Sequence, residues 1–246
     1  MKVNRTTSII CMALTILFGV ATAILQCKSV MLAGISLSIF TGFIITVVVA
    51  LIGYFYEKEK LKNKLHSYIK SLYINLISLK DITGFTLAKI ATTTNLRDLD
   101  FDLISSLADL NVKLSSDVDL ESYNGFFSKS KTACIYKDFL KYVNQLYNLK
   151  HLTSQLLIDS NKHDLQVLTH THQHMQGQWI NPQEAEQLLF LKNAINIRTA
   201  KLHEYEASLI IELDNLANRA YGRKTNWNDV KLLLHNEADD ILSTRS

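Results

Sequence analysis

Residues 30–56 read VMLAGISLSIFTGFIITVVVALIGYFY, a stretch without a single charged side chain. Just before it, residues 8–25 read SIICMALTILFGVATAIL, and this stretch also lacks charge. An α-helix rises about 1.5 Å per residue, so about 20 apolar residues cross the roughly 30 Å hydrocarbon core of a bilayer. Both stretches are long enough. The sequence therefore predicts a transmembrane hairpin in residues 1–56, with spans at about 8–25 and 30–56.

The charges beside the two stretches predict the orientation of this hairpin. Lys2 and Arg5 precede the first stretch, and the turn between the stretches holds only Lys28. Four cations follow the second stretch directly, and we assign them to the membrane surface: Lys58, Lys60, Lys62 and Lys64. Because cytoplasmic flanks carry the excess of Lys and Arg, both termini are expected in the cytoplasm.

Two other interpretations of the first stretch remain open. Ala21-Thr22-Ala23 fits the small-x-small pattern of a signal-peptide cleavage site, although more apolar residues follow it and the run is longer than a signal core of about 7–15 residues. Cys27 could be the lipid-bearing residue of a lipoprotein, but Gln26 occupies the position before it, where a small residue is expected. In either case the lysines after Tyr56 keep residues 57–246 inside.

Residues 57–246 have the pattern of an all-α cytosolic domain, a helical bundle with long coiled-coil-like helices. No segment shows the alternation that is typical of a strand. Apolar residues continue at helical spacing directly after the second stretch, so this span is expected to run on as one helix. They are Leu61, Leu65, Tyr68, Leu72, Leu76 and Leu79. Gly84, Gly125, Gly177 and Gly222 are expected to separate the helices.

Polar capping residues predict where the later helices begin. Asn95 is expected to cap a helix that carries Leu96, Leu99, Leu103, Leu107, Leu110 and Leu114. A cap at Ser128 or Ser130 precedes Ile135, Phe139, Tyr142, Leu146, Leu149 and Leu156. A last short helix, capped by Thr225 or Asn226, carries Trp227, Val230, Leu233 and Leu234.

The clearest start signal is Asn181-Pro182-Gln183-Glu184, since Asn can cap, Pro suits the first helical position and Glu can complete a capping box. From here a seven-residue repeat runs through Leu188, Leu191, Ile195, Leu202, Tyr205 and Leu209, and then shifts to Leu213, Leu216 and Ala220. We expect Leu188, Ile195, Leu202 and Leu209 to be largely buried. The helix from Pro182 to Gly222 is expected to be the longest that lies wholly in the cytosol.

The composition argues against an enzyme. A phosphate-binding loop needs clustered glycines, and the eight glycines of this chain are dispersed. Cys11, Cys27 and Cys134 lack the spacing of a metal site or a disulfide framework. The net charge of +3 is modest and owes much to the lysines near the membrane. We therefore expect no catalytic residue, cofactor or metal.

Small residues recur at every fourth position in both apolar stretches. After Cys11, the first stripe continues with Thr15, Gly19 and Ala23, and the second consists of Gly34, Ser38, Gly42, Thr46 and Ala50. Because lipid gives helices no hydrophobic reason to associate, such stripes let helix backbones approach closely and pack. The two stripes could face each other within one hairpin. Alternatively, the second stripe could join copies of the protein.

Two segments of the cytosolic domain are candidate binding sites. His170 and His174 stand one helical turn apart in a segment that also holds His163 and His172. This spacing is that of metal-binding histidines, and the alternative is a polar helix face in contact with solvent. Residues 219–227 mix cations with aromatics, as single-stranded nucleic-acid sites do. Contact with an anionic partner would use Arg219, Tyr221, Arg223, Lys224 and Trp227. The alternative is a helix C-terminus with favourable cations and a core tryptophan.

In its layout, a two-span hairpin followed by a cytosolic helical domain without catalytic motifs, the chain resembles the two-transmembrane effectors of bacterial anti-phage systems, in particular those that accompany retrons. The resemblance implies a protein of the bacterial inner membrane that a cytosolic partner holds silent, such as a reverse transcriptase with its RNA–DNA product. Release during infection would let it damage the lipid bilayer. The alternative is a membrane-tethered coiled-coil scaffold or adaptor that never perturbs the membrane.

Overall fold

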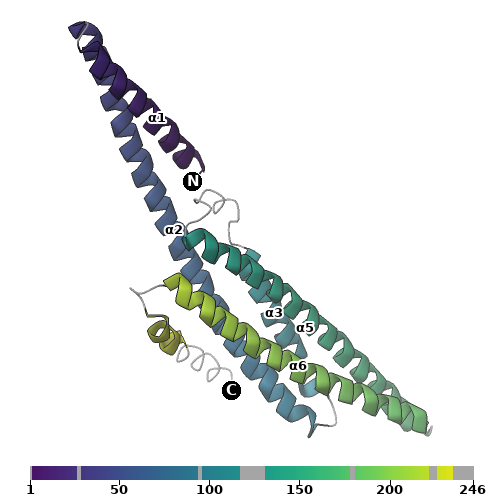
Figure 1. Cartoon of the computed structure of the whole chain (residues 1–246). Helices are drawn as coiled ribbons and strands as arrows, with labels where there is room; N and C mark the ends of the chain where they lie inside the picture. Colours follow the sequence, from purple (N-terminus) through teal and green to yellow (C-terminus); the bar gives the residue numbers. More distant parts are fainter. Residues whose placement is uncertain are drawn as a thin grey trace. The chain divides into compact units, whose positions relative to one another are not determined.

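The computed structural model describes residues 2–26, 29–93, 96–116, 131–177, 181–221 and 226–234 (Figure 1). All regular structure in these ranges is helical, which confirms the all-α prediction for this part of the chain. The chain divides into two compact units. The first comprises residues 1–65 and 119–136, and the second comprises residues 66–118 and 137–246. One long helix, α2, contributes residues to both.

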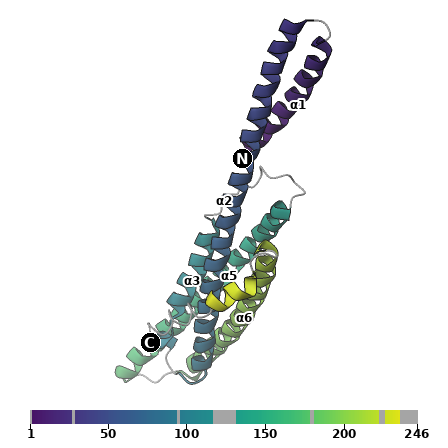
Figure 2. The same cartoon turned by 90° about the vertical axis from the view of Figure 1, so that its left-hand side faces the viewer.

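In the first unit, α1 (Lys2–Leu25) lies beside the first part of α2 (Val30–Ile90), and the two helices run antiparallel (Figures 1 and 2). Helical hydrogen bonding persists at the edges of the connection. The N–H of Gln26 donates to the carbonyl oxygen of Thr22 at 3.0 Å, and the N–H of Ser29 donates to that of Leu25 at 2.9 Å. Both apolar stretches of the sequence are therefore helices, joined by a short connection.

The helix α2 is 61 residues long and continues past the apolar stretch without a break. This confirms that the second stretch runs on as one helix, with Leu65, Leu72, Leu76 and Leu79 buried. The expectation that Gly84 ends a helix was wrong, because Gly84 lies inside α2. A Cβ atom at this position would approach Cε1 of His203 to 3.1 Å, so the glycine leaves room for the His203 ring.

The second unit is a helical bundle in which α2, α3 (Phe101–Ser116), α5 (Lys131–Met175) and α6 (Pro182–Tyr221) lie side by side (Figures 1 and 2). All four helices contribute apolar side chains that are almost fully buried: Leu72, Leu76, Leu79, Ile104, Ala108, Phe139, Leu146, Leu149, Ile195, Leu202 and Leu209. Burial of these apolar faces is what holds the helices together.

The helix expected to begin at Asn95 begins instead at Phe101. Before it, η1 (Leu96–Asp98) forms a single tight turn, in which the N–H of Leu99 donates to the carbonyl oxygen of Leu96 at 3.0 Å. Asn95 itself lies outside the described residues. The core face of α3 consists of Phe101, Ile104, Ala108, Asn111, Val112 and Ser115. The later leucines at 103, 107, 110 and 114 lie to the side of this face, and Leu110 is exposed.

The prediction that the Pro182 helix is the longest outside the spans was wrong, because α5 has 45 residues and α6 has 40. The expected core face of α5 is confirmed, since Ile135, Phe139, Tyr142, Leu146, Leu149 and Leu156 are all buried. The proposed caps at Ser128 and Ser130 lie outside the described residues, as do Gly125 and Gly222. Gly177 follows the end of α5 with φ of 74°, a conformation that glycine adopts without strain.

The start of α6 is as predicted. The side-chain oxygen of Asn181 accepts a hydrogen bond of 3.1 Å from the N–H of Gln183. The repeat of this helix buries Ile195, Leu202, Leu209, Leu213, Leu216 and Ala220. Leu188 is only half-buried, which corrects its expected place in the core.

A short helix at residues 227–234 follows α6 in the sequence. Asn226 caps it through a 3.2 Å hydrogen bond from the N–H of Asn228, while the alternative cap, Thr225, lies outside the described residues. Trp227 and Leu234 are buried, and Leu233 is exposed. The first turn of this helix is thus held in the bundle by its tryptophan.

Candidate functional site

The part of α2 near the N-terminus is long and apolar enough to cross a membrane, as judged by length and composition. Only 11% of its most apolar window is buried within the protein. A core helix of a water-soluble protein would have this window covered by other helices, because exposed apolar surface is unfavourable in water. Residues 9–25 of α1 form a shorter apolar helix. The structure thus gives one candidate membrane-spanning helix near the N-terminus.

The contact between α1 and α2 combines a polar pair with aromatic packing. Thr22 Oγ1 and Ser36 Oγ lie 2.7 Å apart, and both hydroxyls are within hydrogen-bond distance of the Phe18 carbonyl oxygen, at 2.8 and 3.3 Å. The rings of Phe18 and Phe43 stack with their centroids 5.6 Å apart. A Cβ atom on Gly19 would lie 3.1 Å from Cε2 of Phe40. The first small-residue stripe therefore supplies a close approach at Gly19, and its last member, Ala23, is exposed.

Except for Ala50, the second small-residue stripe does not face α1, so the alternative in which the two stripes pack against each other along their length is not what the structure shows. A Cβ atom added to Gly34 or Gly42 would have no neighbour within 4 Å. Ser38 and Thr46 are exposed, and each donates to a carbonyl oxygen of its own helix, four residues back, at 3.1 and 2.9 Å. The buried side of α2 in this unit consists of Ala33, Ser36, Ala50 and Tyr54.

The physical reason for this arrangement is the helical register of the polar pair. Ser36 and Gly34 are two residues apart, which is about 200° around the helix axis. Once Ser36 meets Thr22, Gly34 and Gly42 are on the far side of α2. Ala50 ends the stripe in sequence but belongs to the buried side, because the stripe winds slowly around the helix. The face of Gly34, Ser38, Gly42 and Thr46 is hereafter called the open stripe.

A band of aromatic and basic residues ends the apolar part of α2. Phe55 and Tyr56 are exposed, and the ring of Tyr54 meets that of Phe55 edge to face at 5.6 Å. The lysines at 58, 60, 62 and 64 follow at intervals of two residues and so point to different sides of the helix. Lys62 lies 3.9 Å from Glu59. Aromatic residues next to cations are typical of a membrane–water interface, a signal that the sequence reasoning missed.

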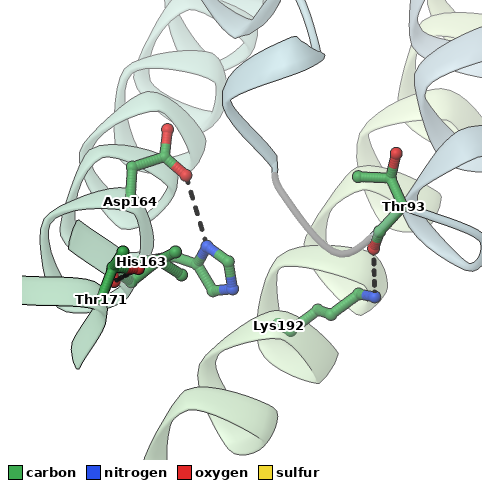
Figure 3. A network of polar contacts seen from close by, with 6 residues as sticks. Thr93, His163, Asp164, Thr171 and Lys192 are labelled. Carbon is green, nitrogen blue, oxygen red and sulfur yellow. Dashed lines mark hydrogen bonds and ion pairs between the residues drawn. The ribbon is translucent and has the colours of Figure 1, made fainter. Parts of the chain in front are cut away.

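The histidine segment lies on α5 and the structure describes all of it. Among the described residues, no group of three or more His, Cys, Asp or Glu side chains is placed to hold a metal ion. His163 is fully buried, with Nδ1 at 3.4 Å from Asp164 Oδ1, and so does not lie on a solvated face (Figure 3). His170 Nε2 lies 3.9 Å from Glu184 Oε2, so the carboxylate predicted to complete the capping box faces a histidine of α5.

The aromatics of residues 219–227 are engaged within the bundle. Tyr221 stacks on His66 with centroids 4.0 Å apart and donates its hydroxyl to the His66 carbonyl oxygen at 3.2 Å. Burial raises the pKa of Tyr221 to about 12. Trp227 donates its Nε1–H to Asp214 at 3.0 Å. These two rings are therefore not free to stack on bases, as the core-tryptophan alternative expected.

The cations of this stretch divide into two groups. Arg219 is exposed and pairs with Asp138, with Nη1 at 2.6 Å from Oδ2. Arg223 and Lys224 lie outside the described residues. An anionic partner would have to compete with Asp138 for Arg219, which lowers the affinity that this residue can contribute.

The bundle also holds a buried carboxyl group that the sequence analysis did not identify. Glu206 is fully buried between α6 and α2, where its Oε1 accepts a hydrogen bond from Thr83. Its position carried a signal, because residue 206 falls four residues after Leu202 and three before Leu209, on the apolar face of the repeat. Burial of a carboxyl group costs free energy unless the group is hydrogen-bonded or protonated. Such residues either lower the stability of the fold or serve a function.

Comparison of the chain with protein-family models, curated proteins and solved structures found no match. The function must therefore be argued from the residues and their geometry.

Proposed function

We propose that this chain is an inner-membrane effector of a bacterial defence system, which perturbs the membrane when a cytosolic partner releases or triggers it. In this proposal α1 and the first part of α2 cross the bilayer as a hairpin, and both termini are cytoplasmic. The helical bundle of the second unit is the part that a partner would hold. A reverse transcriptase with its RNA–DNA product is the partner type that the resemblance implies.

The observation that carries the proposal is the open stripe on α2. A simple anchor would bury its small residues in the contact between its two spans, because close helix packing is what small residues provide. Here Gly34 and Gly42 have no neighbour, while the α1 contact is made by a different side of α2. The stripe thus supplies a surface through which copies of the protein can associate within the bilayer.

The hydroxyls of the stripe are compatible with both a silent and an associated state. Ser38 and Thr46 of the stripe, like Thr41 beside it in the sequence, each donate to a carbonyl oxygen of their own helix. In lipid these bonds leave no donor unpaired. In an assembly the same hydroxyls could rotate to face one another or water. The spans hold no acidic or basic side chain, which argues against a proton relay or an ion-coupled transporter.

Induction of the full chain in bacteria tests this proposal. Membrane potential and entry of a membrane-impermeant dye would be followed in the parent and in Gly42→Leu. We expect the parent to depolarise cells and Gly42→Leu to be harmless, since the added side chain holds the backbones apart. Val48→Leu is the matched control, because Val48 is exposed on the same helix about 120° around the axis from Gly42. A parent that is harmless when freed of every partner would contradict the proposal.

A scaffold function is the second candidate, and the exposed apolar residues of the bundle favour it. Leu165, Leu168, Leu189 and Phe190 are more than half exposed on α5 and α6. Such side chains are typical of surfaces that bind other proteins. A membrane-tethered adaptor would recruit partners through them without damaging the membrane. Induction without depolarisation, together with recovery of a stoichiometric partner, would favour this function.

A further inference from the structure

The helices α5 and α6 extend beyond the core of the bundle. Along the described part of α5, His163 is the last buried residue, and along α6 the first is Ile195. Close to this level Lys192 donates a hydrogen bond of 2.6 Å to the carbonyl oxygen of Thr93, just after the end of α2 (Figure 3). Past this level α5 continues to Met175, and α6 begins only at Pro182. We call residues 164–175 and 182–191 the arm.

The residue spacing that places side chains in the core of the bundle continues along both helices of the arm, although these side chains are not buried there. On α5, Val167, His170 and His174 follow His163 at spacings of four, three and four, which keeps them on the same face. On α6, Leu188 and Leu191 precede Ile195 at the matching spacing. None of these five side chains is buried. The face that is covered in the bundle is therefore uncovered in the arm.

This face forms a groove of about 490 Å³ between the two helices. It is lined mainly by Val167, His170, Thr171 and His174 of α5 and by Ala185 and Leu188 of α6. In the bundle, the α5–α6 layer is covered by a second layer of two antiparallel helices, α2 and α3. The groove lacks that second layer among the described residues.

The polar side chains of the two arm helices are complementary, because an imidazole N–H can donate a hydrogen bond to a carboxylate. The α5 half carries His170, His172 and His174 and no carboxylate after Asp164. The α6 half carries Glu184 and Glu186 and no cation before Lys192. Two arms packed face to face, with α5 of each over α6 of the other, would bring the groove-lining His170 and His174 of one copy next to Glu184 of the other, in addition to the contact of His170 with Glu184 in its own chain. Such an isologous contact repeats each favourable pair twice.

We propose that the arm is a self-docking surface, through which two copies of this chain pack groove to groove about a two-fold axis. Each arm then supplies the two-helix layer that the other lacks, so the apolar stripe of Val167, Leu188 and Leu191 continues as the core of a four-helix contact. This interface is separate from the open stripe on α2. It goes beyond the proposed function, because it holds whether or not the protein damages membranes.

Crosslinking of the full chain in bacterial membranes tests the proposal. The native cysteines are replaced by alanine, and single cysteines are placed in the arm as Thr171→Cys or Ala185→Cys. Ser208→Cys serves as the control position, since it is exposed on α6 outside the arm. With a short bismaleimide, we expect the arm positions to give a dimer of the chain at a yield at least severalfold above the control. Equal yields at all three positions, or crosslinks only to a different protein, would overturn the self-docking surface.

A charge in the groove provides the matched disruption. Leu188→Glu should lower the Thr171→Cys dimer about tenfold, because an unpaired carboxylate would be buried in the contact. Ile211→Glu, which adds the same charge at an exposed position of the same helix, should leave the yield unchanged. Ala185→Trp is a second disruption that fills the groove from an exposed position, in case Leu188→Glu changes the circular dichroism. An unchanged dimer in a folded disruption variant would overturn the proposal.

One more variant distinguishes association through the open stripe from docking through the arm. Gly42→Leu should leave arm crosslinking intact, since its added side chain lies on a different surface of the chain. Loss of toxicity with an intact arm dimer would concern the α2 stripe alone. An arm dimer that disappears with Gly42→Leu would show that the arm does not dock by itself, and it would overturn the inference made here.

Discussion

Thr83 of α2 donates a hydrogen bond of 2.9 Å to Oε1 of Glu206 of α6, and the Glu206 side chain is fully buried. The other carboxyl oxygen lies 3.9 Å from Nδ1 of His203. Burial raises the pKa of Glu206 from 4.5 to about 8, against smaller opposing effects of the Thr83 hydrogen bond and Lys80. The carboxyl group is therefore mostly protonated at neutral pH, and a neutral polar contact joins two helices of the bundle.

The first prediction is a pH dependence of stability. Between pH of about 4.5 and 8, unfolding releases the Glu206 proton, which the folded state retains, so the free energy of unfolding falls as pH rises. The loss is on the order of a few kcal/mol by pH 8. Glu206→Gln has no proton to lose and can still accept from Thr83, so it should be more stable than the parent at pH 8. Urea unfolding of the full chain in detergent, followed by circular dichroism, measures the difference.

The control for this prediction is Glu204→Gln, which removes an exposed carboxylate two residues away on the same helix. This variant should follow the pH profile of the parent. If Glu206→Gln and the parent keep the same difference in stability from pH 5 to 8.5, then Glu206 does not retain its proton in the folded state.

The second prediction concerns the packing of α6. Leu202 is almost fully buried in the bundle, so Leu202→Ala should reduce the free energy of unfolding by about 2–5 kcal/mol through lost contacts and the cavity left behind. Ile197→Ala is the matched control, because Ile197 is exposed on the same helix. Chemical unfolding of both variants tests the packing. Equal losses in the two would mean that the core side of α6 has been misassigned.

The sequence was sufficient for features that depend on local periodicity. The spacing of Leu65, Leu72 and Leu76 indicated that α2 continues past the apolar stretch, and Asn181-Pro182 placed the start of α6. These predictions succeed because a helix face and a capping side chain involve residues only a few positions apart.

Features that depend on distant partners were misjudged. The sequence pattern predicts that Gly84 ends a helix, but Gly84 lies inside α2. Its missing side chain leaves space for the ring of His203, which is far away in the sequence. The sequence of the second stripe allows contact with α1 or contact between copies, and the hydroxyl pair of Thr22 and Ser36 turns Gly34 and Gly42 away from α1. In both cases, a small residue indicates that another group packs closely against the helix, but the sequence does not show which group it is. Only the three-dimensional contacts supply that information.

The third prediction concerns topology, and it tests the positive-inside argument. A membrane-impermeant maleimide applied to spheroplasts should label Cys27, which lies between the two apolar stretches in sequence. Cys134 is exposed on α5 and should be labelled only after the membrane is broken. An alkaline phosphatase fusion at Ser246 should be inactive. Labelling of Cys134 in intact spheroplasts would contradict a cytoplasmic bundle.

The fourth prediction concerns the contact between α1 and α2. Because a Cβ atom on Gly19 would lie only 3.1 Å from the Phe40 ring, Gly19→Leu should push the two helices apart. Thr22→Cys and Ser36→Cys, introduced together in a chain whose native cysteines are replaced, report on this distance, since the two hydroxyl oxygens are 2.7 Å apart. Oxidation should form the disulfide efficiently in the parent background and poorly with Gly19→Leu.

The matched comparison for this last prediction is Gly42→Leu, which adds the same side chain where a Cβ atom has no neighbour within 4 Å. It should leave the Thr22–Ser36 disulfide unchanged. The two glycines therefore separate contact between the helices of one chain from contact between chains, because each added leucine meets only one of the two surfaces. If Gly42→Leu blocks the disulfide as strongly as Gly19→Leu does, the open stripe faces α1 after all, and the side of α2 assigned to self-association is wrong.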